Sequence, residues 1–423
     1  MLKFLSNAWA LLLGMLLLMI GNGLQGTLLG VRGEIEGFST FEMSVVMSAY
    51  FVGFLGGSKL APEMIRRVGH VRVFAALASL ISAVLILYPT FANPWVWTVG
   101  RVIIGFCFCG VYVTAESWLN NAATNETRGQ ALSLYMLVQV VGIMVAQGLL
   151  LVADPGGFIL FVIPSVLVSI AFAPILLSVT PTPPFETTKP MSLRALFKVS
   201  PLGCVGMFLL GGVFAAQFGM AAVYGAQRGL SLAEISMFVT AFYLGATLLQ
   251  FPLGWLSDGM DRRVLIMLTA AVGAVGAVLG MVAGESFTVL LIAAFMVGGT
   301  SNPLYSLLIA YTNDFLDRDD MAAASGGMLF INGVGAIAGP LITGWMMGLF
   351  GSPGYFLLIS VLMVALTLYA AYRMTQRPAP PVSETANYMP VSPTATSVAV
   401  EVAREHAISS TGGDNGTDSA GNA

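Results

Sequence analysis

Long apolar stretches recur along the chain, separated by short breaks rich in charged residues, proline, glycine or asparagine. A helix that crosses a bilayer needs about 20 mostly apolar residues. By that criterion the pattern predicts twelve transmembrane helices, the first of them retained and not cleaved as a signal peptide. The predicted spans are 8–31, 42–61, 72–90, 95–119, 130–153, 158–179, 202–226, 234–256, 264–284, 287–311, 324–349 and 354–373.

The longest internal break runs from residue 181 to 201 and divides the spans into six and six. The two halves resemble each other: Gln25 pairs with Gln217 at an offset of 192 residues, and Arg66-Arg67-Val68 with Arg262-Arg263-Val264 at 196. Such a duplication is common in transporters. We therefore predict an all-α integral membrane fold of two pseudo-symmetric bundles. The predicted units are an N-terminal six-helix bundle (1–180), a cytoplasmic linker (181–201), a C-terminal six-helix bundle (202–376) and a disordered cytoplasmic tail (377–423).

Composition supports a membrane protein and excludes several other classes. The 423 residues are 57% hydrophobic and 9% charged, whereas soluble domains carry about 25% charged residues. A net charge of −3 provides no basic surface for nucleic acid. We expect no metal, because Cys107 and Cys109 lie in an apolar stretch without further ligands. We also expect no cofactor and no enzyme activity, since the chain lacks a phosphate-binding loop and a Ser-His-Asp arrangement.

Lysine and arginine set the orientation, because loops on the cytoplasmic side hold the excess of these residues. With the N-terminus inside, 15 of the 18 basic residues fall on the cytoplasmic side. The sequence therefore predicts a multi-pass protein with both termini in the cytoplasm, in a bacterial inner membrane, surrounded by lipid and functional as a monomer.

The loop after the eighth span is the most specific motif. It reads Gly254-Trp255-Leu256-Ser257-Asp258-Gly259-Met260-Asp261-Arg262-Arg263 and resembles the Gly-x-Leu-x-Asp-x-x-Gly-Arg-Arg signature of the major facilitator superfamily, with Asp261 at the last glycine. The resemblance implies a twelve-helix transporter that works by alternating access. It also implies a conformational latch made by Gly254, Asp258, Arg262 and Arg263. The matching loop of the first half departs from the signature, with Pro62 at the glycine and Arg66 at the aspartate.

The fourth span carries a polar stripe. Arg101, Gly105, Tyr112 and Glu116 fall on one helix face. An ionisable residue inside a membrane is costly and marks a pathway or a pair. Arg101 either faces a cavity, where it would bind an anionic solute, or ties helices together. Glu116 is the candidate proton carrier, or a gating residue paired with Arg128.

Other polar side chains lie within predicted spans one, four, seven and ten, which line the central cavity in the family that the chain resembles. The resemblance therefore implies a substrate site near Asn22, Gln25, Arg101, Tyr112, Gln217, Tyr224, Asn302 and Tyr305. Span eleven contains Gly339-Pro340, a candidate hinge.

The predicted function is secondary transport of a small organic solute, with proton coupling left open. Two alternatives are an exporter of drugs or amphipathic molecules with the same fold, and a transporter-like sensor that binds a partner through its tail. The fifth span lacks the Gly-Pro pair of drug-proton antiporters, which counts against the exporter.

Overall fold

The computed structural model describes residues 2–122, 128–174, 191–282 and 286–378, together with residues 388, 390, 391 and 396. All regular structure in these residues is helical. The helices are α1 (Leu2–Ile35), α2 (Thr40–Val68), α3 (His70–Thr90), α4 (Pro94–Ala122), α5 (Arg128–Leu149), α6 (Ile159–Ala171), α8 (Leu193–Val199), α9 (Pro201–Phe214), η1 (Ala215–Gly219), α10 (Ala221–Gln227), α11 (Leu232–Gly259), α12 (Arg262–Val282), α13 (Phe287–Asn313), α14 (Arg318–Phe350) and α15 (Pro353–Met374).

Eleven helical segments in the described part of the chain are long and apolar enough to span a membrane. The sixth predicted span, 158–179, contains the shorter apolar helix α6, and its residues 175–179 lie outside the described residues. The twelve-helix prediction is confirmed as a fold class, but span seven is not one regular helix. It is divided into α9, the π-helical turn η1 and α10.

The duplicated architecture is visible in matched structural details. Ser39 caps α2 in a capping box with Glu42, and Ser231 caps α11 in the same way with Glu234, 192 residues further on. In each half the second and fourth span cross at glycines. A Cβ on Gly53 would lie 1.9 Å from the carbonyl oxygen of Val102, and one on Gly245 would lie 2.1 Å from that of Phe295. Only glycine permits these backbones to approach so closely.

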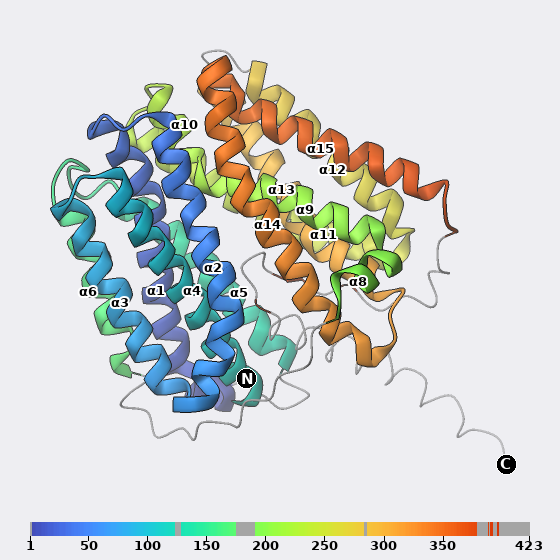
Figure 1. Cartoon of the computed structure of the whole chain (residues 1–423), viewed down its shortest axis with the longest axis horizontal. Helices are drawn as coiled ribbons and strands as arrows, with labels where there is room; N and C mark the ends of the chain where they lie inside the picture. The colour runs from blue at the N-terminus through green and yellow to red at the C-terminus, as the bar shows by residue number, and fades with distance from the viewer. Residues whose placement is uncertain are drawn as a thin grey trace.

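The two halves meet near the side of the molecule opposite the N-terminus and spread apart toward the N-terminal side (Figure 1). Ser48 on α2 donates a 2.6 Å hydrogen bond to the carbonyl of Ile337 on α14. Ser236 on α11 donates one of 2.7 Å to the carbonyl of Gln147 on α5. Because Ser236 lies at the start of α11 and Gln147 at the end of α5, the contact seals the side opposite the N-terminus.

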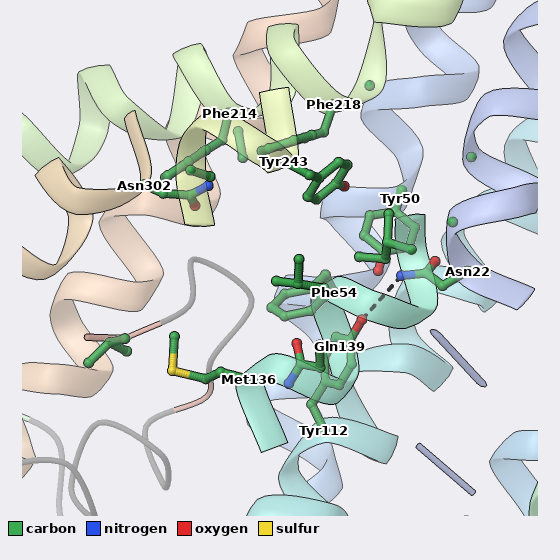
Figure 2. A pocket seen from close by; sticks show the side chains of 18 of the residues that line it. Asn22, Tyr50, Phe54, Tyr112, Met136, Gln139, Phe214, Phe218, Tyr243 and Asn302 are labelled. Carbon is green, nitrogen blue, oxygen red and sulfur yellow. Dashed lines mark hydrogen bonds between the residues drawn. The ribbon is translucent and has the colours of Figure 1, made fainter. Parts of the chain in front are cut away.

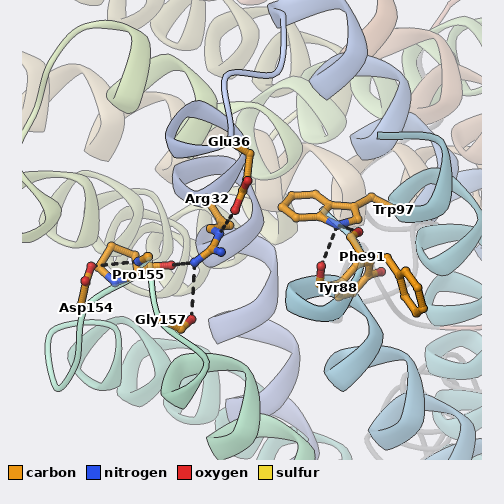
Figure 3. Close-up of polar contacts among 9 residues, drawn as sticks. Arg32, Glu36, Tyr88, Phe91, Trp97, Asp154, Pro155 and Gly157 are labelled. Atoms are coloured by element: carbon orange, nitrogen blue, oxygen red, sulfur yellow. Dashed lines mark hydrogen bonds and ion pairs between the residues drawn. The ribbon is translucent and has the colours of Figure 1, made fainter. Parts of the chain in front are cut away.

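Polar contacts also fix the loops on that opposite side (Figure 3). The Arg32 side chain at the end of α1 donates to Glu36 over 2.6 Å and to the carbonyl of Pro155 over 3.0 Å. It thereby joins α1 to the loop between α5 and α6. Trp97 donates its indole N–H to the carbonyls of Tyr88 and Phe91, which fastens the turn between α3 and α4.

The predicted linker (181–201) and the predicted tail (377–423) consist largely of residues that the structure does not describe. Within the predicted linker, the described part forms α8, which is capped by Ser192. Within the tail that we predicted to be disordered, the described residues beyond α15 include Tyr388, Val391 and Thr396, which are buried against the bundles. For the rest of the tail, disorder stays a prediction.

Candidate substrate cavity

A cavity of about 320 Å³ lies between the two halves. Eight aromatic side chains line it, four from each half, and several of them face one another across it (Figure 2). They are Tyr50, Phe51, Phe54 and Tyr112 from the first half and Phe214, Phe218, Tyr243 and Phe251 from the second. Small-molecule sites are commonly clefts of this size, lined by apolar and aromatic groups with a few oriented polar atoms.

The polar part of the first half is a hydrogen-bonded chain. Arg101 donates to Gln25 over 2.9 Å, Gln25 donates to Asn22 over 3.1 Å, and Asn22 donates to the hydroxyl of Tyr112 over 3.1 Å. All four residues were predicted as cavity candidates, and all four line the cavity. The structure thus brings these residues of α1 and α4 together in one network.

Arg101 is 4% exposed and is largely engaged by the protein. Its guanidinium lies over the Tyr50 ring at 4.7 Å, and Nη2 lies 3.7 Å from the sulfur of Met47. Only Nε has no hydrogen-bond partner within the described part of the chain. These contacts join α4 to α1 and α2. They therefore favour the second predicted role of Arg101, which is to hold helices together.

The candidates in the second half divide into one lining residue and three supporting ones. Asn302 lines the cavity. Gln217, in η1, is buried behind the wall, where its Oε1 accepts a 2.8 Å hydrogen bond from Ser301. Tyr224 stacks on Tyr355 with ring centroids 4.7 Å apart, on the side of the molecule that the halves close.

The third supporting residue, Tyr305, packs edge to face against Phe214, with ring centroids 6.1 Å apart. Neither Gln217, Tyr224 nor Tyr305 is among the residues that line the cavity. Their contacts hold the wall in place, so their assignment to a substrate site stays a prediction that the geometry does not favour.

Sequence reasoning missed most of the aromatic wall and the amide of Gln139. A signal was present: Tyr50 and Phe54, and likewise Phe214 and Phe218, are four residues apart and share a helix face. In an apolar span, however, such pairs are indistinguishable from ordinary packing residues. The π-helical turn at Ala215–Gly219 was equally invisible, although turns of this kind are frequent at functional sites.

The motif that ends α11 and begins α12 contains a buried ion pair. Arg262 forms its ion pair with Asp314, and both side chains are 3% exposed. Its Nε also donates to Ser257 over 3.1 Å. Asp258 lies 3.9 Å from Arg262 and is 42% exposed. A buried contact thus joins the start of α12 to the residue that follows α13, and the latch that the motif implies stays a prediction.

Arg263, the neighbouring arginine, binds Asp261 at 2.8 Å. Partial burial raises the pKa of Asp261, but hydrogen bonds from the Arg263 side chain and backbone, with its charge, outweigh that effect and lower the pKa overall. Arg263 also donates to the carbonyl of Arg377, which follows α15. This pair therefore fastens the end of the last span to α12.

Gly254 packs closely against the C-terminal tail. A Cβ on Gly254 would lie 2.7 Å from the ring of Tyr388. Gly339, by contrast, lies where α14 packs closely against α9. A Cβ on Gly339 would lie 2.7 Å from the carbonyl oxygen of Gly212. Pro340 follows within α14, and its ring lies 3.6 Å from the position of a Cβ on Gly219 in η1.

Glu116 is 2% exposed and accepts a 3.3 Å hydrogen bond from the Tyr135 hydroxyl. It also accepts hydrogen bonds from the backbone N–H and the hydroxyl of Thr396. The side chain of Arg128, its predicted partner, lies outside the described residues. Glu116 therefore joins α4 to α5 and to the C-terminal tail.

Known proteins resemble the chain over most of its length. It is 27% identical over 354 residues to the uncharacterized MFS-type transporter YcaD of Escherichia coli O139:H28, covering 83% of this chain and 91% of the relative. Among solved structures, a mutant of the nucleoside transporter NupG superposes with a TM-score of 0.76 at 14% identity, covering 86% of this chain and 98% of that one. The E. coli fucose:proton symporter FucP gives 0.56 at 15% identity, covering 88% and 99%.

These likenesses in structure concern the fold. The family itself is identified from the sequence, because the Major Facilitator Superfamily model matches residues 11–231 and again 202–407. The two matches together span both halves of the duplicated architecture. The chain therefore belongs to the Major Facilitator Superfamily of transporters.

Proposed function

We propose that this transporter moves an uncharged small organic solute that carries a ring, by alternating access of one central cavity to the two sides of the membrane. The observation that carries the proposal is the wall of the cavity. Aromatic rings from both halves face a space that also contains the amides of Asn22, Gln139 and Asn302. Such a site favours a flat molecule with a few hydrogen-bonding groups.

The state of Arg101 supports an uncharged solute. A guanidinium that bound a carboxylate would present its paired N–H groups to the cavity. Here one terminal nitrogen donates to Gln25 and the other faces the Met47 sulfur, while the plane of the group lies over Tyr50. The charge of Arg101 is thus already committed to protein groups, and an anion would have to displace them.

Two structurally similar proteins are described as a nucleoside transporter and a fucose:proton symporter. Nucleosides and fucose are uncharged. Both solutes have rings and several hydroxyl groups. This is compatible with the amides and tyrosines of the cavity. For proton coupling, the candidate is Glu116, a buried carboxylate at the contact between α4, α5 and the tail. We further propose cytoplasmic termini, on the basis of the basic residues on the N-terminal side. A bacterial inner membrane and a monomer are also part of the proposal.

Counterflow in proteoliposomes tests the proposal. Vesicles loaded with unlabelled uridine and diluted into labelled uridine should accumulate label transiently, while vesicles loaded with benzoate should not exchange labelled benzoate. Phe218→Ala, which removes a wall residue, should reduce uridine exchange, and Phe197→Ala, on an exposed side chain of α8, should not. Exchange of benzoate alone would refute the proposed solute class. Exchange only of hydrophobic cations would instead favour the exporter.

A further inference from the structure

The C-terminal tail contributes part of the cavity wall. Pro390 and Val391 line the cavity, although they follow the last helix by more than a dozen residues. The N–H of Val391 donates to the Ser306 hydroxyl over 2.9 Å, and its carbonyl accepts from the same hydroxyl over 3.1 Å. Ser306 lies on α13, so this contact fixes the tail to the second half.

Tyr388 is held by α11 of the same half. Its backbone N–H donates to Asp258 over 2.6 Å, and its hydroxyl accepts a 3.0 Å hydrogen bond from Gln250. Its ring rests on Gly254, where any side chain would intrude. Tyr388 is 9% exposed, which is unusual for a tyrosine in a polar tail.

Thr396 reaches the other half of the molecule. Its N–H donates to Glu116 on α4 over 3.0 Å, and its hydroxyl donates to the same carboxylate. The described tail residues thus contact α11 and α13 on one side of the cavity and α4 on the other. Glu116 lies near the end of α4 and Gly254 near the end of α11, so these contacts are on the N-terminal side, where the halves spread apart (Figure 1).

The sequence of this segment suits an apolar, uncharged site. No charged residue occurs between Glu384 and Glu401, although the tail on either side contains charges. Proline is present at positions 390 and 393. Proline restricts the free chain, so less conformational entropy is lost when the segment is fixed.

We infer that the tail segment carrying Tyr388, Val391 and Thr396 is an intramolecular ligand that occupies the mouth of the cavity on the N-terminal side. While it is bound there, the halves cannot close on that side and a solute cannot pass. The tail therefore has to leave for each transport cycle, and it slows access to the cavity. The effect on transport rests on the proposed function, whereas the docking itself does not.

The test measures access to the cavity without any solute. Ala246 lines the cavity on α11, two helical turns from Gly254, and is buried. In a full-length chain whose native cysteines are replaced by alanine, Ala246→Cys is labelled with a polar maleimide in detergent. Gly254→Val should displace Tyr388 and raise the labelling rate about tenfold. A tenfold change corresponds to a loss of docking free energy similar to that of about one hydrogen bond.

Gly259→Val is the matched control, because a Cβ at Gly259 of the same helix has no neighbour within 4 Å. It should leave the rate unchanged. Tyr388→Ala, which alters only the tail, should reproduce the rise seen with Gly254→Val. Equal rates in the parent, Gly254→Val and Tyr388→Ala chains would overturn the inference. Because the readout needs no substrate, that result would leave the proposed solute class untouched.

Discussion

Arg101 on α4 donates a 2.9 Å hydrogen bond to Gln25 on α1, and this contact places Arg101, which lines the cavity, at the end of a polar network within the first half. Removal of one partner from a buried hydrogen bond leaves the other unsatisfied. The pair is therefore a structural contact as well as part of the cavity wall.

Arg101→Lys should lower the thermal stability of the purified protein by an amount equivalent to about 1–3 kcal/mol. Lysine keeps the charge but cannot both stack on Tyr50 and reach Gln25, because it lacks the planar fork of arginine. Thermal unfolding in detergent measures the change. Arg66→Lys is the control, because Arg66 forms an exposed ion pair with Glu63. This variant should have the same unfolding temperature as the parent protein. Equal unfolding temperatures for both variants would show that the Arg101 contacts contribute nothing to stability.

Asp314→Asn should destabilise the protein strongly, by about 3–5 kcal/mol, because it removes the buried carboxylate that pairs with the buried charge of Arg262. Asp258→Asn is the matched variant. Asp258 is 42% exposed and 3.9 Å from Arg262, so we expect a loss of at most about 1 kcal/mol. Chemical denaturation in detergent compares the two. A larger loss in Asp258→Asn would contradict this ranking and favour the latch that the sequence motif implies.

Gly344→Val should abolish transport without unfolding the chain. A Cβ at Gly344 on α14 would lie 2.4 Å from the Cβ of Ser44 on α2, where the halves close on the side opposite the N-terminus. A valine there prevents that closure and traps the cavity open to that side. Gly348→Val, one turn further along α14, meets no atom within 4 Å and should transport normally. Solute counterflow is the assay, and normal exchange by Gly344→Val would exclude α2 and α14 as a gate.

Glu116→Gln should separate exchange from accumulation. The amide oxygen can still accept the hydrogen bonds from Thr396, and the amide NH2 can donate to the Tyr135 hydroxyl, but the side chain cannot take up a proton. Counterflow should therefore persist, while accumulation driven by an imposed pH gradient should be lost. Equal loss of both activities would indicate a structural role, and full retention of both would remove Glu116 as the proton carrier.

The membrane-spanning helices were predictable because they depend on local composition. Apolar runs and the repeat between halves specify the spans, and the motif that ends at Arg263 identifies the family. The polar candidates on α1 and α4 were also found, since polar side chains in an apolar span are conspicuous.

The remaining features depend on contacts between distant segments. Asp314 lies 52 residues from Arg262, and no local pattern connects them. Tyr388 stands in a stretch whose composition is typical of disorder, so its burial could not be read from the sequence. The aromatic wall was hidden because an apolar ring in a membrane span is the default, whether it packs against a helix or faces a cavity.

The proposed function requires that the cavity accepts uncharged ring-containing solutes. Thermal stabilisation of the purified protein by matched panels of nucleosides, aromatic carboxylates and hydrophobic cations tests this requirement most directly, because a ligand that binds the folded state raises the unfolding temperature. We expect stabilisation by one or more nucleosides, reduced in Tyr243→Ala, whose side chain lines the cavity. Stabilisation by carboxylates alone, lost in Arg101→Gln, would contradict it.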